Sequence, residues 1–469
     1  MNKIEVSLKK FNELFNDRRN IVVPEYQRPY IWGKEKSEEF LKDLEEYFIM
    51  GSPNMPYYIG TILYFLNKKE DRYEIIDGQQ RITTLLIMQR IVTDEKLSTV
   101  QNISFDSHQS IQYIKEAQAY FQKNKDILAK LQQKDIFKKL SLTLIITHSE
   151  DDAFTFFDTQ NNRGVKLGAT DYLKAYHLRA IKSDGLQEVN ARLWEKSSSK
   201  TKEGSLLPHL FEKILWRSRN WKGNQIQFEN KDAILKTFQK NTIKSEDSHS
   251  YPVYPNRLNR QIVMHRFEQD GKLVQEPSST IQNEGHEYPF SLRQPLYKGL
   301  NFFRYTDRYM SIYNLLFKIT KHPSPDLLET RKFYQDVYNF DTSVYLRHFM
   351  QVCLIGYYDV FGGTNILSAA YAFDYLIGSM RLQKQQIKKE AVRLCLTENP
   401  NNLLDVITTA FLPEEIIQFI YSIDEVDKVY EEEKIVLNEG VRGRYKNRVL
   451  TYFNKTDKSL INRKSWSKN

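Results

Sequence analysis

The feature that most constrains this sequence is a β-strand that passes into an α-helix with almost no connection between them. Tyr73-Glu74-Ile75-Ile76 has the aromatic and β-branched character of a strand. From Arg81 to Val92 apolar residues recur at helical spacing, and only Asp77-Gly78-Gln79-Gln80 separates the two elements. Gly78 lets the backbone approach a ligand closely, and the first helical turn offers N–H groups without intrahelical partners and the positive end of the dipole. The junction therefore predicts a binding site for an anion.

Side chains suited to a phosphate group gather within one helical turn of this junction. They are the amides of Gln79 and Gln80, the planar guanidinium of Arg81 and the hydroxyl of Thr83 or Thr84. Asp77, at the end of the strand, is placed to bind Mg²⁺ or to orient a water molecule. We therefore predict Asp77 and Arg81 as catalytic residues. The alternative is an ordinary strand-to-helix turn, in which Asp77 caps the helix and Arg81 makes a structural ion pair.

Two other segments carry polar side chains in a distinctive setting. In Pro24–Trp32, Gln27 and Arg28 stand among aromatic residues, and two prolines hold the backbone extended, which suits presentation of Arg28 to a ligand. The alternative is an aromatic corner packed against the helix that follows. In Phe157–Leu167, Asn161-Asn162-Arg163-Gly164 is strong turn chemistry after a helix, and by itself it requires no ligand.

Periodicity divides the chain into a mixed N-terminal part and a helical C-terminal part. Residues 57–66 and 73–76 predict a hairpin, 142–147 a further strand, and 35–48 and 107–140 amphipathic helices. Past Leu186 the strand signals fade, and helical patterns dominate up to about residue 430. We therefore predict an α+β protein with a mixed domain at 1–185, a helical domain at 186–435 that includes an irregular loop at 241–290, and a basic tail at 436–469.

Positive charge is concentrated at the C-terminus. The formal net charge of the chain is +9, and residues 440–469 alone hold nine basic residues and one acid. Aromatic residues interleaved with these cations could stack on bases while the cations follow a phosphate backbone. The residues predicted to bind DNA on this basis are Arg442, Arg444, Lys446 and Arg448. The alternative is a solvated terminus, because charge runs are often simply soluble ends.

What the sequence lacks argues against several other classes of protein. Cys353 and Cys395 are too few for a disulfide framework or a four-thiolate zinc site, and they fit a reducing compartment. Neither a Gly-x-x-x-x-Gly-Lys-Ser/Thr loop nor a His-Glu-x-x-His sequence is present. No stretch reaches the roughly 18 apolar residues of a membrane span, and the N-terminus has no signal-peptide core. We expect a cytoplasmic protein without a membrane partner; the oligomeric state stays open, a homo-oligomer included.

Three motifs in a fixed order resemble a known family. Pro-x-Tyr-Gln-Arg-Pro-Tyr-x-Trp is followed by Asp-Gly-Gln-Gln-Arg-x-Thr-Thr-Leu, and then by Phe-x-x-x-Asn-x-Arg-Gly-x-x-Leu with a downstream Asp-x-Leu-Lys. This order resembles the GmrSD-type domain of unknown function, whose N-terminal part is similar to the ParB and sulfiredoxin fold. The motifs cover roughly residues 20–180. Two later segments, Pro289–Leu292 and Tyr357–Gly362, look like the helical region of the same family, less distinctively.

The resemblance implies a component of a modification-dependent restriction or anti-phage system. It implies that the Asp-Gly-Gln-Gln-Arg domain binds and hydrolyses a nucleoside triphosphate, with Mg²⁺, and so regulates cleavage of DNA that carries a modification. By motif match the nucleotide site comprises Asp77, Gly78, Gln79, Gln80 and Arg81, with Gln27, Arg28, Asn161 and Arg163 nearby. In such families cleavage belongs to a separate His-Asn-His nuclease domain or subunit, which is the implied partner.

Two alternatives from other classes stay open. The first is a non-catalytic adaptor, in which nucleotide or DNA binding orders the domain so that it docks a nuclease. The second is an autonomous metal-dependent nuclease, because His286-Glu287-Tyr288-Pro289 has the spacing of a His-x-x-Pro nuclease motif. That segment falls in the predicted irregular loop, and no β-hairpin is expected before it, which argues against the nuclease.

Overall fold

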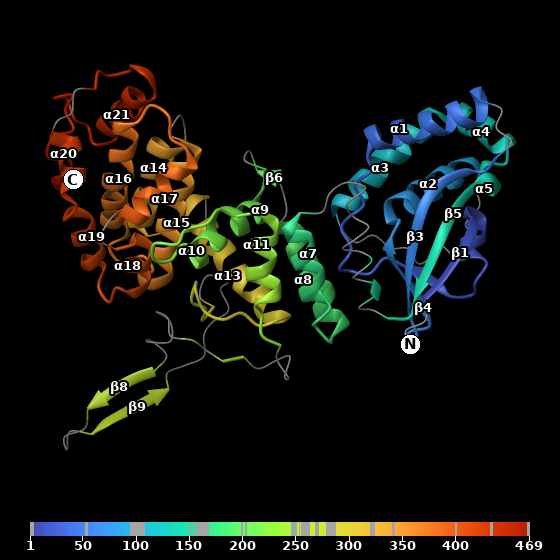
Figure 1. Cartoon of the computed structure of the whole chain (residues 1–469), viewed down its shortest axis with the longest axis horizontal. Coiled ribbons are helices and arrows are strands. Elements are labelled where there is room, and N and C mark those ends of the chain that lie inside the picture. The colour runs from blue at the N-terminus through green and yellow to red at the C-terminus, as the bar shows by residue number, and fades with distance from the viewer. Residues whose placement is uncertain are drawn as a thin grey trace. The chain divides into compact units, whose positions relative to one another are not determined.

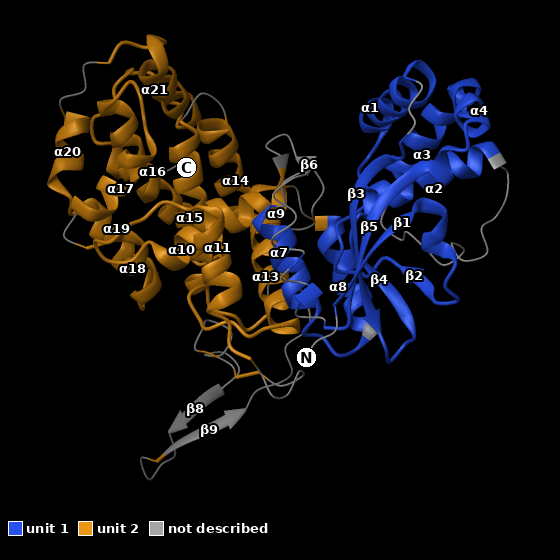
Figure 2. Ribbon diagram, turned by 45° about the vertical axis from the view of Figure 1, so that its right-hand side comes forward, with its two compact units in different colours: residues 1–196 blue, residues 197–469 orange. Residues whose placement is uncertain are grey.

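The computed structural model divides the chain into two compact units. Unit 1 is Met1–Lys196 and unit 2 is Ser197–Asn469 (Figures 1 and 2). The structure describes residues 4–51, 55–93, 108–149, 152–153, 156, 168–197, 200–201, 204–244, 251–252, 254, 263–267, 272–277, 288–318, 324–339, 343–398, 401–431 and 435–466. The predicted α+β class is confirmed. The unit boundary lies at the end of helix α8 (Asp184–Ser197), whereas the sequence placed the domain boundary at its start, at 185.

Unit 1 is built on a mixed five-stranded sheet in the order β1-β5-β3-β4-β2. Its strands are β1 (Ile4–Lys10), β2 (Asn20–Val22), β3 (Tyr57–Asn67), β4 (Arg72–Asp77) and β5 (Leu140–Thr147). The expected hairpin is the antiparallel pair β3–β4, while β5 runs parallel to β3 and β2 runs parallel to β4. These parallel neighbours come from distant parts of the chain, so the sheet centre depends on long-range pairing that local patterns do not reveal.

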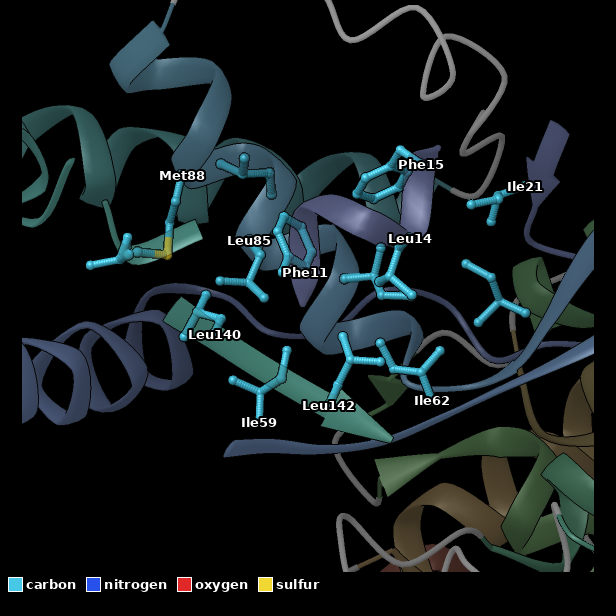
Figure 3. Close-up of a cluster of buried hydrophobic side chains, with 14 of the residues drawn as sticks. Phe11, Leu14, Phe15, Ile21, Ile59, Ile62, Leu85, Met88, Leu140 and Leu142 are labelled. Carbon is cyan, nitrogen blue, oxygen red and sulfur yellow. The ribbon is translucent and has the colours of Figure 1, made fainter. Parts of the chain in front are cut away.

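Helices on one face of this sheet bury its apolar side chains. The helical segments of unit 1 are η1 (Phe11–Phe15), α1 (Lys34–Glu45), η2 (Glu46–Met50), α2 (Gln79–Thr93), α3 (His108–Lys123), α4 (Lys125–Gln133), α5 (Ile136–Lys139), α7 (Ala169–Leu178) and α8. Ile62 of β3 and Leu142 of β5 meet Leu85 and Met88 of α2 in a core that also takes in Phe11 (Figure 3). Because strand side chains alternate between faces, this packing sends the neighbouring positions of β3 and β4 to the opposite face.

Unit 2 is mainly helical. Its elements are β6 (Lys200–Thr201), β7 (Gly204–Ser205), α9 (Leu206–His209), η3 (Leu210–Leu215), α10 (Trp216–Asn220), α11 (Lys231–Leu235), η4 (Lys236–Lys240), β8 (Val263–Phe267), β9 (Leu273–Pro277), α13 (Leu300–Phe317), α14 (Pro325–Tyr338), α15 (Val344–Phe361), α16 (Ile366–Gln383), α17 (Lys389–Glu398), α18 (Leu403–Thr409), α19 (Pro413–Tyr421), α20 (Asp424–Glu431), α21 (Gly440–Tyr452) and η6 (Arg463–Ser465). Helix α16 packs against α14, α15, α19, α20 and α21. It is buried on nearly all sides, as expected of a central helix. In the described part of the chain, no helix is both long enough and apolar enough to cross a membrane.

The segment predicted as an irregular loop at 241–290 contains an antiparallel strand pair, β8–β9. The expectation that no hairpin precedes His286 was therefore wrong, because the short strands lack a clear period-2 pattern. His286 itself lies outside the described residues, and so does the rest of the segment between β9 and Tyr288.

A buried carboxylate joins the two segments that resembled the helical region of the family. Asp359 of α15 accepts hydrogen bonds from Arg308 Nη2 (2.9 Å), from the Tyr309 hydroxyl (2.9 Å) and from the backbone N–H of Leu292 (2.7 Å). Burial of both charges is tolerable because each has a partner of opposite sign and further hydrogen bonds. The segment before α13 is thus fixed to the centre of the bundle.

The predicted basic tail is an integral part of unit 2. Helix α21 packs against α14 and α16, and its aromatic residues Tyr445 and Tyr452 are buried, as is Phe453 just after it. Trp466 lies against Phe453, with ring centroids 5.7 Å apart. The solvated-terminus alternative therefore does not describe residues 440–466, and these aromatic rings belong to the core of the bundle instead of lying ready to stack on bases.

Candidate nucleotide site at the start of helix α2

The strand-to-helix junction is as short as the sequence predicted. Strand β4 ends at Asp77 and α2 begins at Gln79, which leaves Gly78 alone between them. Gly78 has φ +94°, and a Cβ at this position would lie 2.9 Å from Ile62 Cγ1. Both the backbone conformation and the close contact with β3 require glycine here. The first N–H groups of α2 are therefore held directly at the end of the strand.

Arg81 is turned towards the sheet. Its Nη1 donates to the Ile59 carbonyl (2.7 Å), and its Nη2 donates to the Thr61 carbonyl (2.7 Å) and to Asp77 Oδ2 (3.2 Å). The register of β3 with β5 shifts between Tyr58 and Thr61, so the guanidinium lies where the ladder is irregular. This is the ion pair of the structural alternative, and it uses three of the five N–H donors that an arginine has. Arg81 holds β3 and Asp77 in place.

Two other residues of the predicted site have buried polar atoms without a partner. Gln79 and Thr83 are each 5% exposed, and Gln79 Oε1 and Thr83 Oγ1 make no hydrogen bond within the described residues. Leaving a buried polar group unsatisfied costs about 1–3 kcal/mol. Buried polar atoms without a partner call for an explanation, and a ligand or a bound water at this end of α2 would supply one.

Gln80 and Gln27 attach the Pro24–Trp32 segment to the junction. Gln80 Oε1 accepts from the backbone N–H of Ile31 (2.9 Å), and Gln80 Nε2 donates to the Pro29 carbonyl (3.2 Å). Gln27 Nε2 donates to the Ile76 carbonyl of β4 (2.9 Å). Both amides therefore have structural partners, and their effect is to fix the position of Arg28 between them.

Arg28 lies in a partly buried environment of opposite charges. Burial lowers the pKa of Arg28, and the carboxylates of Asp171 and Asp77 oppose that change. Asp171 comes from α7, where its Oδ2 accepts from the backbone N–H of Gly168 (2.8 Å). Arg28, Asp77 and Asp171 thus form one electrostatic cluster built from three separate motifs of the sequence.

Lys174 is a site residue that the sequence interpretation did not select. It is 4% exposed, its Nζ donates to the Gln27 carbonyl (3.2 Å), and it pairs with Glu195 (3.1 Å). The signal was present in the Asp-x-Leu-Lys motif, whose Asp and Lys are Asp171 and Lys174. The predicted site residues Asn161 and Arg163 lie outside the described residues.

A cavity of about 860 Å³ lies in unit 1, at the start of the Pro24–Trp32 segment. Its wall includes Val22–Tyr26, the residues directly before Gln27, together with Arg72 and the buried Glu74 of β4. Among the described residues that line it, none belongs to α2. It therefore adjoins the base of the Arg28 segment and does not open onto Gly78.

Two histidines of unit 2, His209 and His348, belong to its packing. His209 Nε2 lies 2.8 Å from Gln351 Oε1, and the His209 and His348 ring centroids are 4.8 Å apart. Burial, reinforced by the neighbouring His209 and by nearby cationic side chains, lowers the pKa of His348 from its ordinary 6.5 to about 3. His348 is therefore neutral in the folded chain throughout the physiological range.

This lowered pKa predicts a pH-dependent stability. Between pH 3 and 6.5 the unfolded state binds the proton of His348 and the folded state does not, so the free energy of unfolding falls as the pH is lowered through this window. At pH 5 the loss is about 2 kcal/mol relative to pH 7. Urea unfolding of the wild type and of His348→Gln at both pH values measures it, and we expect a smaller difference in the variant. An equal difference in both proteins would assign the acid sensitivity to other groups.

The four predicted DNA-binding residues do not share one environment. Lys446 is 5% exposed, and its Nζ donates to the Ile435 carbonyl (2.9 Å), so it supports the turn before α21 and does not face solvent. Arg442 Nη1 lies 3.5 Å from the Leu382 carbonyl. Arg444 is exposed, and Arg448 Nη1 lies 3.3 Å from the Asp336 carbonyl of α14. Of the four, only Arg444 and Arg448 line one groove.

The comparisons with known proteins match the two units separately. Residues 11–178 match the model of the GmrSD restriction endonuclease N-terminal domain, so unit 1 contains a domain of this type. Residues 186–436, more than half of the chain, match a family of unknown function, DUF7834, and the chain belongs to that family. No curated protein matches the chain.

Proposed function

We propose that this chain is the nucleotide-binding regulatory component of a cytoplasmic restriction or anti-phage system that acts on foreign DNA. The match of residues 11–178 to a restriction endonuclease N-terminal domain supports the restriction part. The nucleotide part rests on one observation: Gln79 Oε1 and Thr83 Oγ1 are buried without partners at the start of α2, where a helix end already favours a phosphate. Cleavage is assigned to a separate His-Asn-His nuclease partner.

We assign different roles to the two arginines. Arg28 directly follows a turn in which the Gln27 N–H donates to the Pro24 carbonyl (2.9 Å), so the extended backbone expected for this segment was wrong at Pro24–Gln27. We assign to Arg28 the charge that binds phosphate oxygens, close to the α2 N-terminus. Arg81 is a positioning residue, because its contacts with Ile59, Thr61 and Asp77 already hold it against the sheet. Asp77 orients the attacking water. By motif match alone, Asn161 and Arg163 are assigned to the same nucleotide site.

The residues at the junction suit Mg²⁺ only if the substrate supplies further ligands. Within the described residues no three His, Cys, Asp or Glu side chains are grouped as an all-protein metal site. Mg²⁺ commonly takes one or two carboxylates together with substrate phosphates and water. Asp77 would hold the ion in this way, and the ion would neutralise charge on the phosphates.

The test is release of phosphate from each of the four nucleoside triphosphates by the full chain, with and without DNA. Asp77→Asn is expected to lower phosphate release by at least about 100-fold while leaving triphosphate binding within a few fold. Arg28→Gln is expected to weaken binding itself by about tenfold or more. Arg90→Gln, an exposed arginine on the same helix, and Asp126→Asn, an exposed carboxylate on α4, are the matched controls and should behave as wild type.

A non-catalytic adaptor is the second candidate, and the same experiment separates it. Asp77 shares its Oδ2 with Arg81, an arrangement that a purely structural junction would also have. An adaptor would bind triphosphate in an Arg28-dependent manner yet release no phosphate under any condition. Absence of both binding and release would overturn the nucleotide proposal as a whole.

A further inference from the structure

A groove on unit 2 gathers cationic side chains from two helices. It has a volume of about 810 Å³ and lies between α14 and α21, which pack against each other. Lys332 comes from α14, and Arg444 and Arg448 come from α21; Asp336 is the acidic residue in the lining. Lys332 and Arg444 are both exposed. Cations therefore outnumber carboxylates by three to one along the described lining of this groove.

The spacing on α21 explains why these side chains share one face. Arg444, Asn447, Arg448 and Thr451 follow one another at i, i+3, i+4 and i+7, so they form a stripe along the helix. Another face of the helix carries Tyr445 and Val449, which are buried in the bundle. Burial of the aromatic face thus fixes the polar stripe outward, with successive arginines one turn apart.

Asparagines at both ends of α21 add hydrogen-bonding groups to the rim of the groove. Asn438 precedes the helix and Asn454 follows it, with φ of +64° and +53°. Asn454 lies just past the helix C-terminus, at the left-handed position where asparagine is one of the few tolerated side chains besides glycine. The lining of the groove therefore includes asparagine amides at both ends of α21, in addition to its cations.

We propose that this groove binds the phosphodiester backbone of DNA. The inference rests on the proposed function for the identity of the polyanion; the charge and the geometry of the groove come from unit 2 alone. Lysine, arginine and asparagine are among the side chains that contact phosphate oxygens in protein–DNA interfaces. The assignment includes Lys332, which the sequence did not single out, and excludes Lys446, whose amine is buried.

The test is to measure, by fluorescence anisotropy, the binding of a labelled DNA duplex to the full chain at a range of salt concentrations. Lys332→Gln/Arg444→Gln is expected to weaken binding by about tenfold for each cation removed near 0.1 M salt, and to reduce the slope of log affinity against log salt by about two. Lys388→Gln/Lys428→Gln removes the same charge at exposed positions outside the groove and is the matched control. It should change both quantities little.

Additional measurements separate the groove proposal from the nucleotide proposal. The groove variant should bind triphosphate as wild type does, and Arg28→Gln should retain DNA binding with an unchanged salt slope. Arg448→Gln, a single change in the same groove, should reduce the slope by about one. An unchanged slope in the groove variants, equal weakening in the control, or equal binding of polyglutamate at the same charge would each overturn the groove as a DNA site. None of these results would affect the nucleotide site.

Discussion

Replacing Asp374 with alanine is expected to lower the free energy of unfolding of unit 2 by about 3–5 kcal/mol. Asp374 is fully buried in α16, and its Oδ1 accepts from the hydroxyls of Tyr338 (2.7 Å) and Tyr445 (2.8 Å). Its Oδ2 accepts from Arg463 Nη2 (2.8 Å). Removing the carboxylate leaves the buried Arg463 guanidinium without its counter-charge, and that penalty dominates the loss. Urea unfolding followed by circular dichroism measures it.

The control and the double variant show whether the buried charge is the cause. Asp457→Ala removes an exposed carboxylate from the same region and should change the free energy of unfolding by less than about 0.5 kcal/mol. Asp374→Leu/Arg463→Met removes both charges together and should recover much of the loss. If the double variant is as unstable as Asp374→Ala, packing volume and not charge explains the effect.

This network also shows what counting charges cannot reveal about the C-terminal segment. Counting charges in residues 440–469 identified a cationic segment correctly, but it did not distinguish cations that face solvent from those that pair inside the bundle. Arg463 is 1% exposed and lies over the Phe453 ring at 4.3 Å. Arg463 can be buried because it pairs with Asp374 of the distant helix α16. The local sequence around Arg463 does not reveal this partner.

The fold followed from sequence wherever a local pattern was sufficient. The β3–β4 hairpin and helix α2 were predictable because alternation, a polar turn and helical spacing are all local. The pairing of β1 with β5 was not, because its partners lie far apart along the chain of unit 1. Strand β1 also exposes Val6 and Leu8, which breaks the usual relation between apolar residues and burial.

The sequence was sufficient to nominate residues for the candidate site, but it was less informative about what each residue does. The carboxylate of Asp77 acts electrostatically on Arg28, which comes from a different motif of the sequence. The sequence could not show that Arg81 reaches back across the junction, because its acceptors are main-chain carbonyls, which leave no trace in side-chain identity. The residue type of Arg81 suggested that it binds phosphate. In the structure its guanidinium instead binds two main-chain carbonyls of β3, where the register with β5 is irregular.

The last prediction follows from that difference. Arg81→Ala is expected to lower the free energy of unfolding of unit 1 by about 2–4 kcal/mol, because two carbonyls of β3 are deprived of charged hydrogen-bond donors and Asp77 of its ion pair. Phosphate release should fall as well, since Asp77 is no longer held. Urea unfolding measures the loss of stability, and titration of a fluorescent triphosphate measures whether nucleotide affinity also changes. Arg90→Ala on the same helix is the control for helix propensity.

A phosphate clamp would give the opposite pattern. If Arg81 bound the nucleotide directly, Arg81→Ala would unfold at the wild-type urea concentration and lose triphosphate affinity, and Arg81→Lys would restore part of that affinity through its charge. A positioning residue behaves otherwise: lysine cannot bridge Ile59, Thr61 and Asp77 with one ammonium group in the planar geometry that the guanidinium provides. We therefore expect Arg81→Lys to remain destabilised, with Arg28 supplying the phosphate contact in both variants.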